Sequence, residues 1–187
     1  MRLRVQYNAP VVLTFAFLSL AVLALDRLTG GVSTLRLFCV YRAPLTDPLT
    51  YVRMVGHVLG HAGWSHYLGN MMLLLVVGPP LEEKYGSRRL LVCILITALV
   101  SGLVQFFFFP GTALLGASGI VFMMILLSSL SGMRNGAIPL TLVLVVLLYL
   151  GGELADAQSA QDGVSHLTHI VGGLCGGVLG FWMRRRR

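Results

Sequence analysis

Apolar runs of nearly membrane-spanning length set the strongest constraint on how this chain folds. Six of them, each 17 to 20 residues long, are separated by polar or charged stretches. A helix needs about 20 apolar residues to cross the hydrocarbon core of a bilayer. Because backbone polar groups in lipid must be paired within the protein, spanning segments of this kind fold as helices. The sequence therefore predicts an all-α polytopic membrane protein in a single domain, residues 1–187, with spans at residues 9–25, 64–81, 90–109, 114–132, 136–152 and 167–183.

The charged residues support this interpretation by their scarcity and their placement. They make up 11% of the chain, which is less than half of the roughly 25% typical of soluble domains. If the N-terminus is cytoplasmic and the spans alternate, ten basic residues lie inside and four outside, which is the positive-inside bias. We therefore expect cytoplasmic termini, and a membrane-surface anchor rather than a nucleic-acid site at the terminal arginine run. The inside set is Arg2, Arg4, Lys84, Arg88, Arg89, Arg134 and Arg184–Arg187, and the outside set is Arg27, Arg36, Arg42 and Arg53.

Three features of the first half of the chain carry further expectations. Residues 9–25 should remain as an uncleaved first span, since the run is longer than a signal-peptide core and lacks a small-residue cleavage site. The 40-residue loop that follows, residues 26–65, must pack on protein or line a water-filled cavity wherever it lies at membrane depth. In the second span, Gly78-Pro79-Pro80 is expected to break the helix, because proline removes a backbone donor and clashes with the preceding turn.

Ser118 and His169 are the pair of residues that most clearly indicates chemistry. Each lies near the start of a predicted span, the fourth and the sixth, so alternation places both toward the outer face on helices that run the same way. A serine hydroxyl becomes a nucleophile when an adjacent imidazole takes its proton. Since none of the seven acidic residues falls inside a span on the outer side, we expect a Ser–His dyad. Phe122, one helical turn beyond Ser118, could hold the imidazole by ring stacking.

His66 and Asn70 share one face of the second span, because they are four residues apart. Together with the backbone N–H of Ser118 they could donate to the oxyanion that forms during acyl transfer. The alternative is that both side chains only bond neighbouring helices. Gly172 and Gly176 follow His169 in a GxxxG pattern, which lets two helices approach closely and would bring His169 to Ser118.

Parts of this pattern are similar to two other kinds of site, the GxSxG elbow of soluble hydrolases and a zinc site. The Gly116-Ala-Ser118-Gly119 motif lacks the final glycine of the GxSxG elbow and opens a helix in an apolar run, so a soluble hydrolase is excluded. His57, His61 and His66 have a spacing that could bind zinc, but no HExxH glutamate accompanies them. We expect no metal and no cofactor, and we interpret His57 and His61 as residues that hold the long loop by hydrogen bonds. The three cysteines, which are widely spaced, are interpreted as packing residues.

At these residues the sequence resembles the rhomboid family of intramembrane serine proteases. The resemblance covers about residues 51–180 and depends on an ordered set of motifs rather than on any one of them. The set is His57-x3-His61-x4-His66-x3-Asn70, Glu82-x3-Gly86, Gly116-Ala-Ser118-Gly119 and His169-x2-Gly172-x3-Gly176. The chain departs from the family pattern in having Val52-Arg53 where Trp-Arg is frequent, and phenylalanine at position 122 where bacterial members often have tyrosine.

The resemblance implies a six-helix bundle with a water-accessible cavity that opens to the outer face. Ser118 would be the nucleophile, His169 the general base, and His66, Asn70 and the Ser118 N–H the oxyanion hole. Glu82 and Gly86 would be structural, with His61, Gly116, Gly119, Phe122, Gly172 and Gly176 supporting the site. The partners implied are transmembrane protein substrates, cleaved near their outer membrane boundary, and the lipid bilayer itself. The length of the chain favours a bacterial inner membrane.

Two other functions are compatible with parts of this pattern. One is an inactive rhomboid-like scaffold that binds transmembrane helices, against which the intact Ser118 and His169 argue. The other is a small transporter or channel in which His66, Asn70 and His169 form a polar relay. Substrate entry is expected beside the fifth span, whose residues 138–150 are almost uniformly apolar. The identity of the substrate and the oligomeric state are left open by the sequence.

Overall fold

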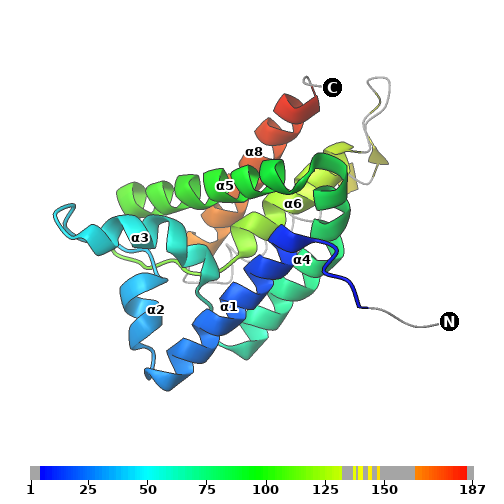
Figure 1. The fold of residues 1–187 in the computed structure, drawn as a ribbon. Coiled ribbons are helices and arrows are strands. Elements are labelled where there is room, and N and C mark those ends of the chain that lie inside the picture. Colours follow the sequence, from blue (N-terminus) through cyan, green and yellow to red (C-terminus); the bar gives the residue numbers. More distant parts are fainter. Residues whose placement is uncertain are drawn as a thin grey trace.

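The computed structural model describes residues 5–131, 137, 139, 140, 143, 144, 147 and 163–184; within 163–184, side chains are described at 170–180 and 182. Helices make up almost all of its regular structure (Figure 1). Among the described residues, Val40 and Leu114 form an isolated antiparallel β-bridge. The predicted all-α fold class is confirmed. The elements are α1 (Pro10–Leu28), α2 (Val32–Leu37), α3 (Pro48–Gly56), η1 (His57–Leu59), α4 (Trp64–Tyr85), α5 (Ser87–Phe108), α6 (Ser118–Ser131) and α8 (Gly163–Arg184).

The helices differ in how well they match the predicted spans. Of those described, α1 and α5 are long and apolar enough to cross a membrane, with mean hydropathies of 2.0 and 2.5. The helix α6 is shorter than the predicted span 114–132, because the chain before Ser118 forms a loop in which Leu114 pairs with Val40. The predicted span 136–152 lies largely outside the described residues. The number of six spans therefore stays a prediction.

The expected break at Gly78-Pro79-Pro80 is wrong. The helix α4 runs through both prolines and ends only at Tyr85. The interior prolines deprive this part of α4 of two backbone donors, so the helix there depends on packing against the rest of the protein. Gly78 supplies part of that packing, since a Cβ at this position would lie 2.7 Å from the side chain of Val12 in α1.

Glu82 joins the same part of α4 to the beginning of α1. Its two carboxylate oxygens accept hydrogen bonds from the backbone N–H groups of Val11, at 2.9 Å, and Val12, at 3.0 Å. The first N–H groups of a helix have no partner inside the helix, and the N-cap residue Ala9 offers no side-chain cap. Glu82, which is 4% exposed, is therefore the cap of a helix that lies 70 residues away in the chain.

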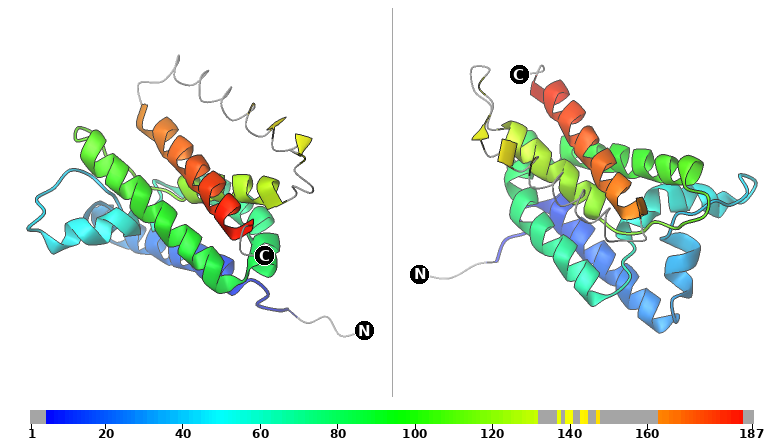
Figure 2. Two further views of the ribbon diagram at one scale, coloured as in Figure 1. Left: turned by 90° about the horizontal axis from the view of Figure 1, so that it is seen from above. Right: turned by 180° about the vertical axis from the view of Figure 1, so that it is seen from behind.

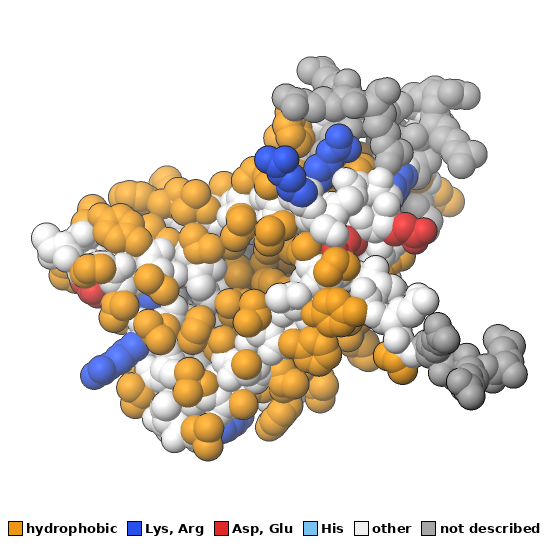
Figure 3. Space-filling model, in the orientation of Figure 1, with side chains coloured by type: hydrophobic (Ala, Val, Ile, Leu, Met, Phe, Trp, Pro, Cys, Tyr) orange, Lys and Arg blue, Asp and Glu red, His pale blue; other side chains and the backbone are white. Residues whose placement is uncertain are grey.

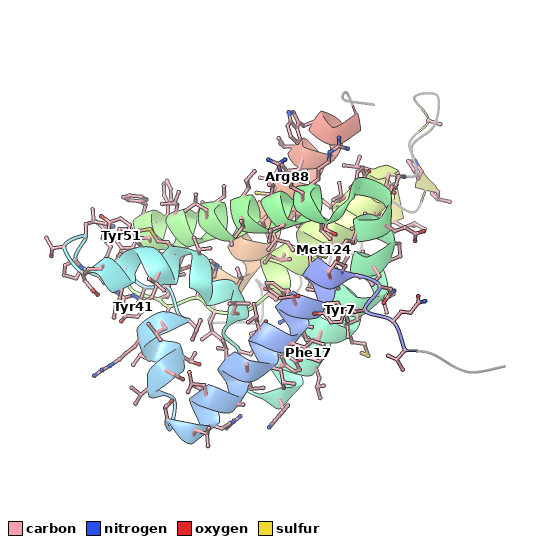
Figure 4. The ribbon with its side chains drawn as sticks, in the orientation of Figure 1. Tyr7, Phe17, Tyr41, Tyr51, Arg88 and Met124 are labelled. Carbon is pink, nitrogen blue, oxygen red and sulfur yellow. The ribbon has the colours of Figure 1, made fainter. Side chains whose placement is uncertain are left out.

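The helix α6 lies between α4 and α8. It packs against both, and most extensively against α8, which also contacts α5 (Figure 2). Its inward side chains, including Ile120, Met123, Met124 and Leu127, are fully buried. Met124 lies inside the bundle, whereas Phe17 of α1, which is 58% exposed, points away from it (Figure 4). The element that begins with Ser118 is thus the most enclosed helix of the described chain.

The loop between α1 and α4 is an ordered structure that contains α2, α3 and η1 and projects to one side of the bundle (Figure 1). Arg53 holds it together from a buried position. Its guanidinium donates to the Asp47 carboxylate at 2.7 Å and to the carbonyl of Arg36 at 3.2 Å, and it lies over the ring of Tyr41 at 4.7 Å. The Val52-Arg53 departure therefore leaves the loop anchored through the arginine. Gly102 of α5 meets the backbone of Met54 and fixes the loop against the bundle.

The surface has the character expected of a protein surrounded by lipid. Hydrophobic side chains cover most of the face shown in Figure 3. Large apolar residues of α4 and α5 are exposed, among them Leu68, Met72, Val76, Leu95 and Leu99. Lysine and arginine side chains gather on that face near the start of α5, where Arg88 lies (Figure 4).

Candidate active site

Ser118 is the first residue of α6 and follows a loop whose position is set by the backbone. Leu114 and Val40 exchange two backbone hydrogen bonds of 2.9 Å, and the N–H of Gly116 donates to the carbonyl of His57 at 2.9 Å. Gly116 has a φ of +124°, a conformation that residues with a Cβ rarely adopt. The sequence around Ser118 therefore requires glycine at position 116 for the loop to enter the helix.

The loop lies directly against His66. A Cβ at Gly116 would be 2.8 Å from both Cε1 and Nε2 of the His66 ring, and 4.0 Å from Nδ2 of Asn70. The absence of a side chain at position 116 thus allows the loop to approach the two side chains predicted to be oxyanion donors. The structure brings Gly116, His66, Asn70 and Ser118 together, although they come from segments about 50 residues apart in the chain.

A cavity of about 450 Å³ is lined by His66, Asn70 and Ser118 of this group. Its polar side is formed by His66 and Asn70 of α4 and by Ser118, while apolar side chains of α4, α6 and the preceding loop form the rest. Phe122 takes part in the wall one turn beyond Ser118. The full lining is Ser65, His66, Gly69, Asn70, Leu73, Leu114, Leu115, Ser118, Val121 and Phe122.

The hydrogen bonds around His66 and Asn70 orient both side chains. The N–H of Ala62 donates to Nδ1 of His66 at 3.4 Å. When Nδ1 of a neutral imidazole accepts, the proton is on Nε2, which is the nitrogen that faces Gly116. Nδ2 of Asn70 donates to the carbonyl of His66 at 3.1 Å, which uses one of the two N–H bonds of that amide. Each side chain can therefore direct a donor into the cavity.

His61 supports His66 from outside the cavity. The two rings meet edge to face at 5.0 Å, and Tyr67 contacts the other side of the His61 ring at 5.5 Å. Nδ1 of His61 lies 3.1 Å from the carbonyl of Leu59. Burial, and to a lesser extent the nearby His66, lowers the pKa of His61 to about 4, so this ring is neutral at physiological pH.

His57 meets the loop through its ring and through its backbone. Its ring is fully buried beside the backbone of Arg53 and Met54. The backbone carbonyl of His57 accepts a hydrogen bond from the N–H of Gly116, in the loop before Ser118. The expectation that its side chain holds the loop by hydrogen bonds stays a prediction.

The backbone of α8 shows where His169 lies along the bundle, while its side chain is outside the described residues. A Cβ at Gly172 would meet the carbonyl of Gly119, and one at Gly176 would lie 2.5 Å from the carbonyl of Met123. The two helices therefore approach most closely next to Ser118. Because His169 is one turn before Gly172, its part of α8 passes the same end of α6. The pairing of His169 with Ser118 stays a prediction.

Some contributors to the cavity were not predicted. Ser65, Gly69 and Leu73 of α4 all line it, and their spacing of four residues, next to His66 and Asn70, could have indicated this. The contribution of Leu114 could not have been predicted, because it follows from pairing with Val40. Glu82 and Gly86, by contrast, lie at the far end of α4 beside α1. Among the described residues, no group of His, Cys, Asp or Glu has the arrangement of a metal site.

Comparison with known proteins shows the family to which the chain belongs. The Rhomboid domain family matches residues 48–186, which is well over half of the 187 residues. The chain belongs to the rhomboid family. The resemblance inferred from the motifs is thereby confirmed. Family membership and the apolar helices α1 and α5 together indicate that this rhomboid is an integral membrane protein.

The relatives of this rhomboid come from bacteria and animals. The rhomboid protease GlpG of Pectobacterium atrosepticum is 29% identical over 181 residues, covering 95% of this chain and 64% of the relative. Rhomboid-related protein 1 of Caenorhabditis elegans is 33% identical over 138 residues, covering 69% of this chain and 39% of the relative. Rhomboid-related protein 2 of Mus musculus is 28% identical over 157 residues, covering 73% and 52%. The chain thus spans 39% to 64% of the length of these relatives.

Proposed function

We propose that this rhomboid is an intramembrane serine protease that hydrolyses a peptide bond in or next to transmembrane helices of other membrane proteins. The observation that carries the proposal is the cavity in which Ser118 begins α6 beside His66 and Asn70. The relatives named rhomboid proteases support the reaction class. Peptide hydrolysis by serine needs a nucleophile, a base, and donors for the oxyanion, and the chain has a residue for each.

In the proposed mechanism, the Oγ of Ser118 attacks the carbonyl carbon of the scissile bond while His169 takes its proton. The same imidazolium then gives the proton to the leaving amine, which departs and leaves an acyl-enzyme on Ser118. Water, deprotonated by His169, hydrolyses the ester and restores the serine. A general base of this kind contributes about 10² to 10⁴ to the rate.

The oxyanion would be held by Nε2–H of His66, by the Asn70 amide and by the Ser118 backbone N–H. The last of these belongs to the first turn of α6, where N–H groups have no partner within the helix. The positive end of the helix dipole also lies there and favours negative charge. Removing one donor of an oxyanion hole lowers kcat by about 10²- to 10³-fold, so Asn70 and His66 are expected to act on the rate more than on binding.

The two ends of α4 support an orientation of the protein in the membrane. The cavity is lined by residues from its first half, 65–73, whereas Lys84, Arg88 and Arg89 lie at or just after its other end. By the positive-inside rule the basic end is cytoplasmic, so the cavity opens to the outer face, for a bacterial protein the periplasmic side of the inner membrane. Reporter fusions after residues 86 and 112 test this, since the first should report cytoplasm and the second the outer side. The reverse result would contradict the orientation.

Covalent labelling tests the function without a known substrate. Purified protein is treated with a fluorophosphonate, and the adduct is read by intact mass and peptide mapping, with Ser118→Ala and His169→Ala alongside. An adduct on Ser118 that requires His169 is expected. Absence of any adduct in folded protein, combined with retained binding of transmembrane peptides, would instead identify a non-enzymatic scaffold.

A further inference from the structure

Gly69 is a residue of the cavity wall that the proposed mechanism does not use. It lies in the second turn of α4, with Ser65 one turn before it and Leu73 one turn after it, and all three line the cavity. This stripe is adjacent on the helix to the one that carries His66 and Asn70. Gly69 is therefore next to the groups expected to hold the oxyanion.

Packing against the described residues does not require a glycine at this position. Elsewhere in the described helices, glycine permits close contact, as where Gly78 meets Val12 and Gly102 meets the backbone of Met54. A Cβ at Gly69 would have no atom of the described residues within 4 Å, and the φ of Gly69 is outside the left-handed region. A glycine in the interior of a helix is less favourable than alanine, because it loses more backbone freedom on folding. What the missing side chain provides here is space in the cavity.

The surroundings define what that space can hold. At about 450 Å³ the cavity is within the range of ligand-binding pockets. One side presents the polar groups of His66, Asn70 and Ser118, and the wall beside Gly69 is apolar, formed by residues such as Leu73 and Phe122. A substrate backbone carbonyl fits the polar side. A large apolar side chain fits the wall, where it would be removed from water and gain contact with these residues.

We propose that Gly69 determines substrate specificity: by leaving this part of the wall open, it admits a bulky apolar side chain of the substrate close to the scissile bond. The occupant is of the leucine or phenylalanine class. The inference rests on the proposed protease function, because it concerns the same cavity. Filling position 69 should then exclude large substrate side chains while small ones are still cleaved.

A size series with a matched control tests this. The variants are Gly69→Ala, Gly69→Val and Gly69→Leu, with Gly177→Leu in α8 as the control. Among the described residues, Gly177 also has no atom within 4 Å of a Cβ, and it is not among the residues that line the cavity. The substrates are otherwise identical transmembrane segments in which each of the four residues around the cleaved bond is in turn alanine or leucine. Cleavage rates and cleavage sites are measured together with fluorophosphonate labelling of Ser118 and the melting temperature.

We expect the Leu-to-Ala ratio of cleavage rates, at one substrate position, to fall in steps across the series and by about tenfold or more in Gly69→Leu. Gly177→Leu should leave the ratio unchanged. Should Gly69→Leu fail to fold, the trend of this ratio from glycine to alanine to valine decides whether position 69 sets the specificity. If every variant labels at Ser118 and cleaves with the wild-type ratio at all four positions, the specificity role is overturned and the protease function stands. If the wild type neither labels nor cleaves, the proposed function itself fails.

Discussion

At the scale of single residues, Gly116 shows how one backbone position governs the site. Its positive φ and the nearness of the His66 ring both exclude a side chain. The N–H of Gly116 also donates to His57, so this residue links the loop before Ser118 to the ordered loop after α1. A residue with no functional group thus sets where Ser118, the proposed nucleophile, begins α6.

Gly116→Ala should therefore damage the site more than its size suggests. A strained non-glycine backbone costs about 1–3 kcal/mol, and the added methyl group must displace His66. We expect a loss of fluorophosphonate labelling of Ser118 of at least about tenfold, the factor that 1.4 kcal/mol represents. Gly111→Ala is the control in the same loop, because a Cβ there has no atom of the described residues within 4 Å. Equal labelling by the two variants would contradict this account.

At the scale of elements, the capping of α1 by Glu82 joins the start of α1 to the last part of α4. Replacing Glu82 by glutamine turns one of its two acceptors into a donor that faces a backbone N–H, which is a buried mismatch. Leaving such a group unsatisfied costs about 1–3 kcal/mol.

We accordingly expect Glu82→Gln to lower the melting temperature in detergent while the folded fraction still labels at Ser118. Glu83→Gln, at the exposed neighbouring position, is the control and should leave the melting temperature unchanged. A loss of labelling in fully folded Glu82→Gln would show instead that Glu82 acts on the site itself.

The loop element that contains α2 and α3 should respond to acid through Asp47. A hydrogen bond from Arg53, followed by one from the backbone of Leu49, lowers the pKa of Asp47 below its ordinary value. A carboxyl whose folded pKa is lowered stabilises the fold above its unfolded pKa, and this contribution disappears as the pH falls through the folded pKa.

We therefore expect the wild type to lose part of the stability of this loop below about pH 4, the ordinary range for aspartate. Asp47→Asn should be less stable than the wild type at neutral pH, and it should not lose this contribution when the pH falls. Limited proteolysis of the loop across pH 3–7 measures both. Parallel pH profiles for the two proteins would rule out a contribution from Asp47.

At the scale of the whole molecule, the crossing of α6 and α8 decides whether a dyad can form. The backbones meet at Gly172 and Gly119, next to Ser118, and the contact continues at Gly176 and Met123. Helices that pack through glycine approach more closely than any side chain would allow. The two residues proposed for catalysis come from these two helices, so the distance between them depends on this crossing.

Gly172→Ala should separate the helices at that point. The added methyl group would overlap the carbonyl of Gly119, and overpacking of this kind typically costs about 1–3 kcal/mol. We expect a lower melting temperature and a decrease in Ser118 labelling, whereas Gly177→Ala, at an open position of the same helix, should show neither. Normal labelling of Gly172→Ala would argue that His169 does not depend on the crossing.

The sequence was sufficient for the features that depend on local pattern. The apolar runs predicted an all-α chain, since a helix is the way such a run pairs its own backbone groups in lipid. His66 and Asn70 could be assigned to one face because their spacing is that of a helical turn. The ordered motifs around Ser118 and His169 predicted the family. Each of these inferences needs residues that are near one another in the chain, or motifs whose order alone is informative.

Only the tertiary structure decided what depends on contacts between distant segments. The bridge from Leu114 to Val40 makes α6 begin at Ser118, four residues after the apolar run does. Contacts with α1 accompany the passage of α4 through Pro79 and Pro80, where a local rule predicts a break. Gly69 likewise lines a cavity, with no described atom within 4 Å of a Cβ, because of how α4 packs against the other segments. Local sequence determines which conformations are favourable, whereas packing between segments determines which of them the folded molecule adopts.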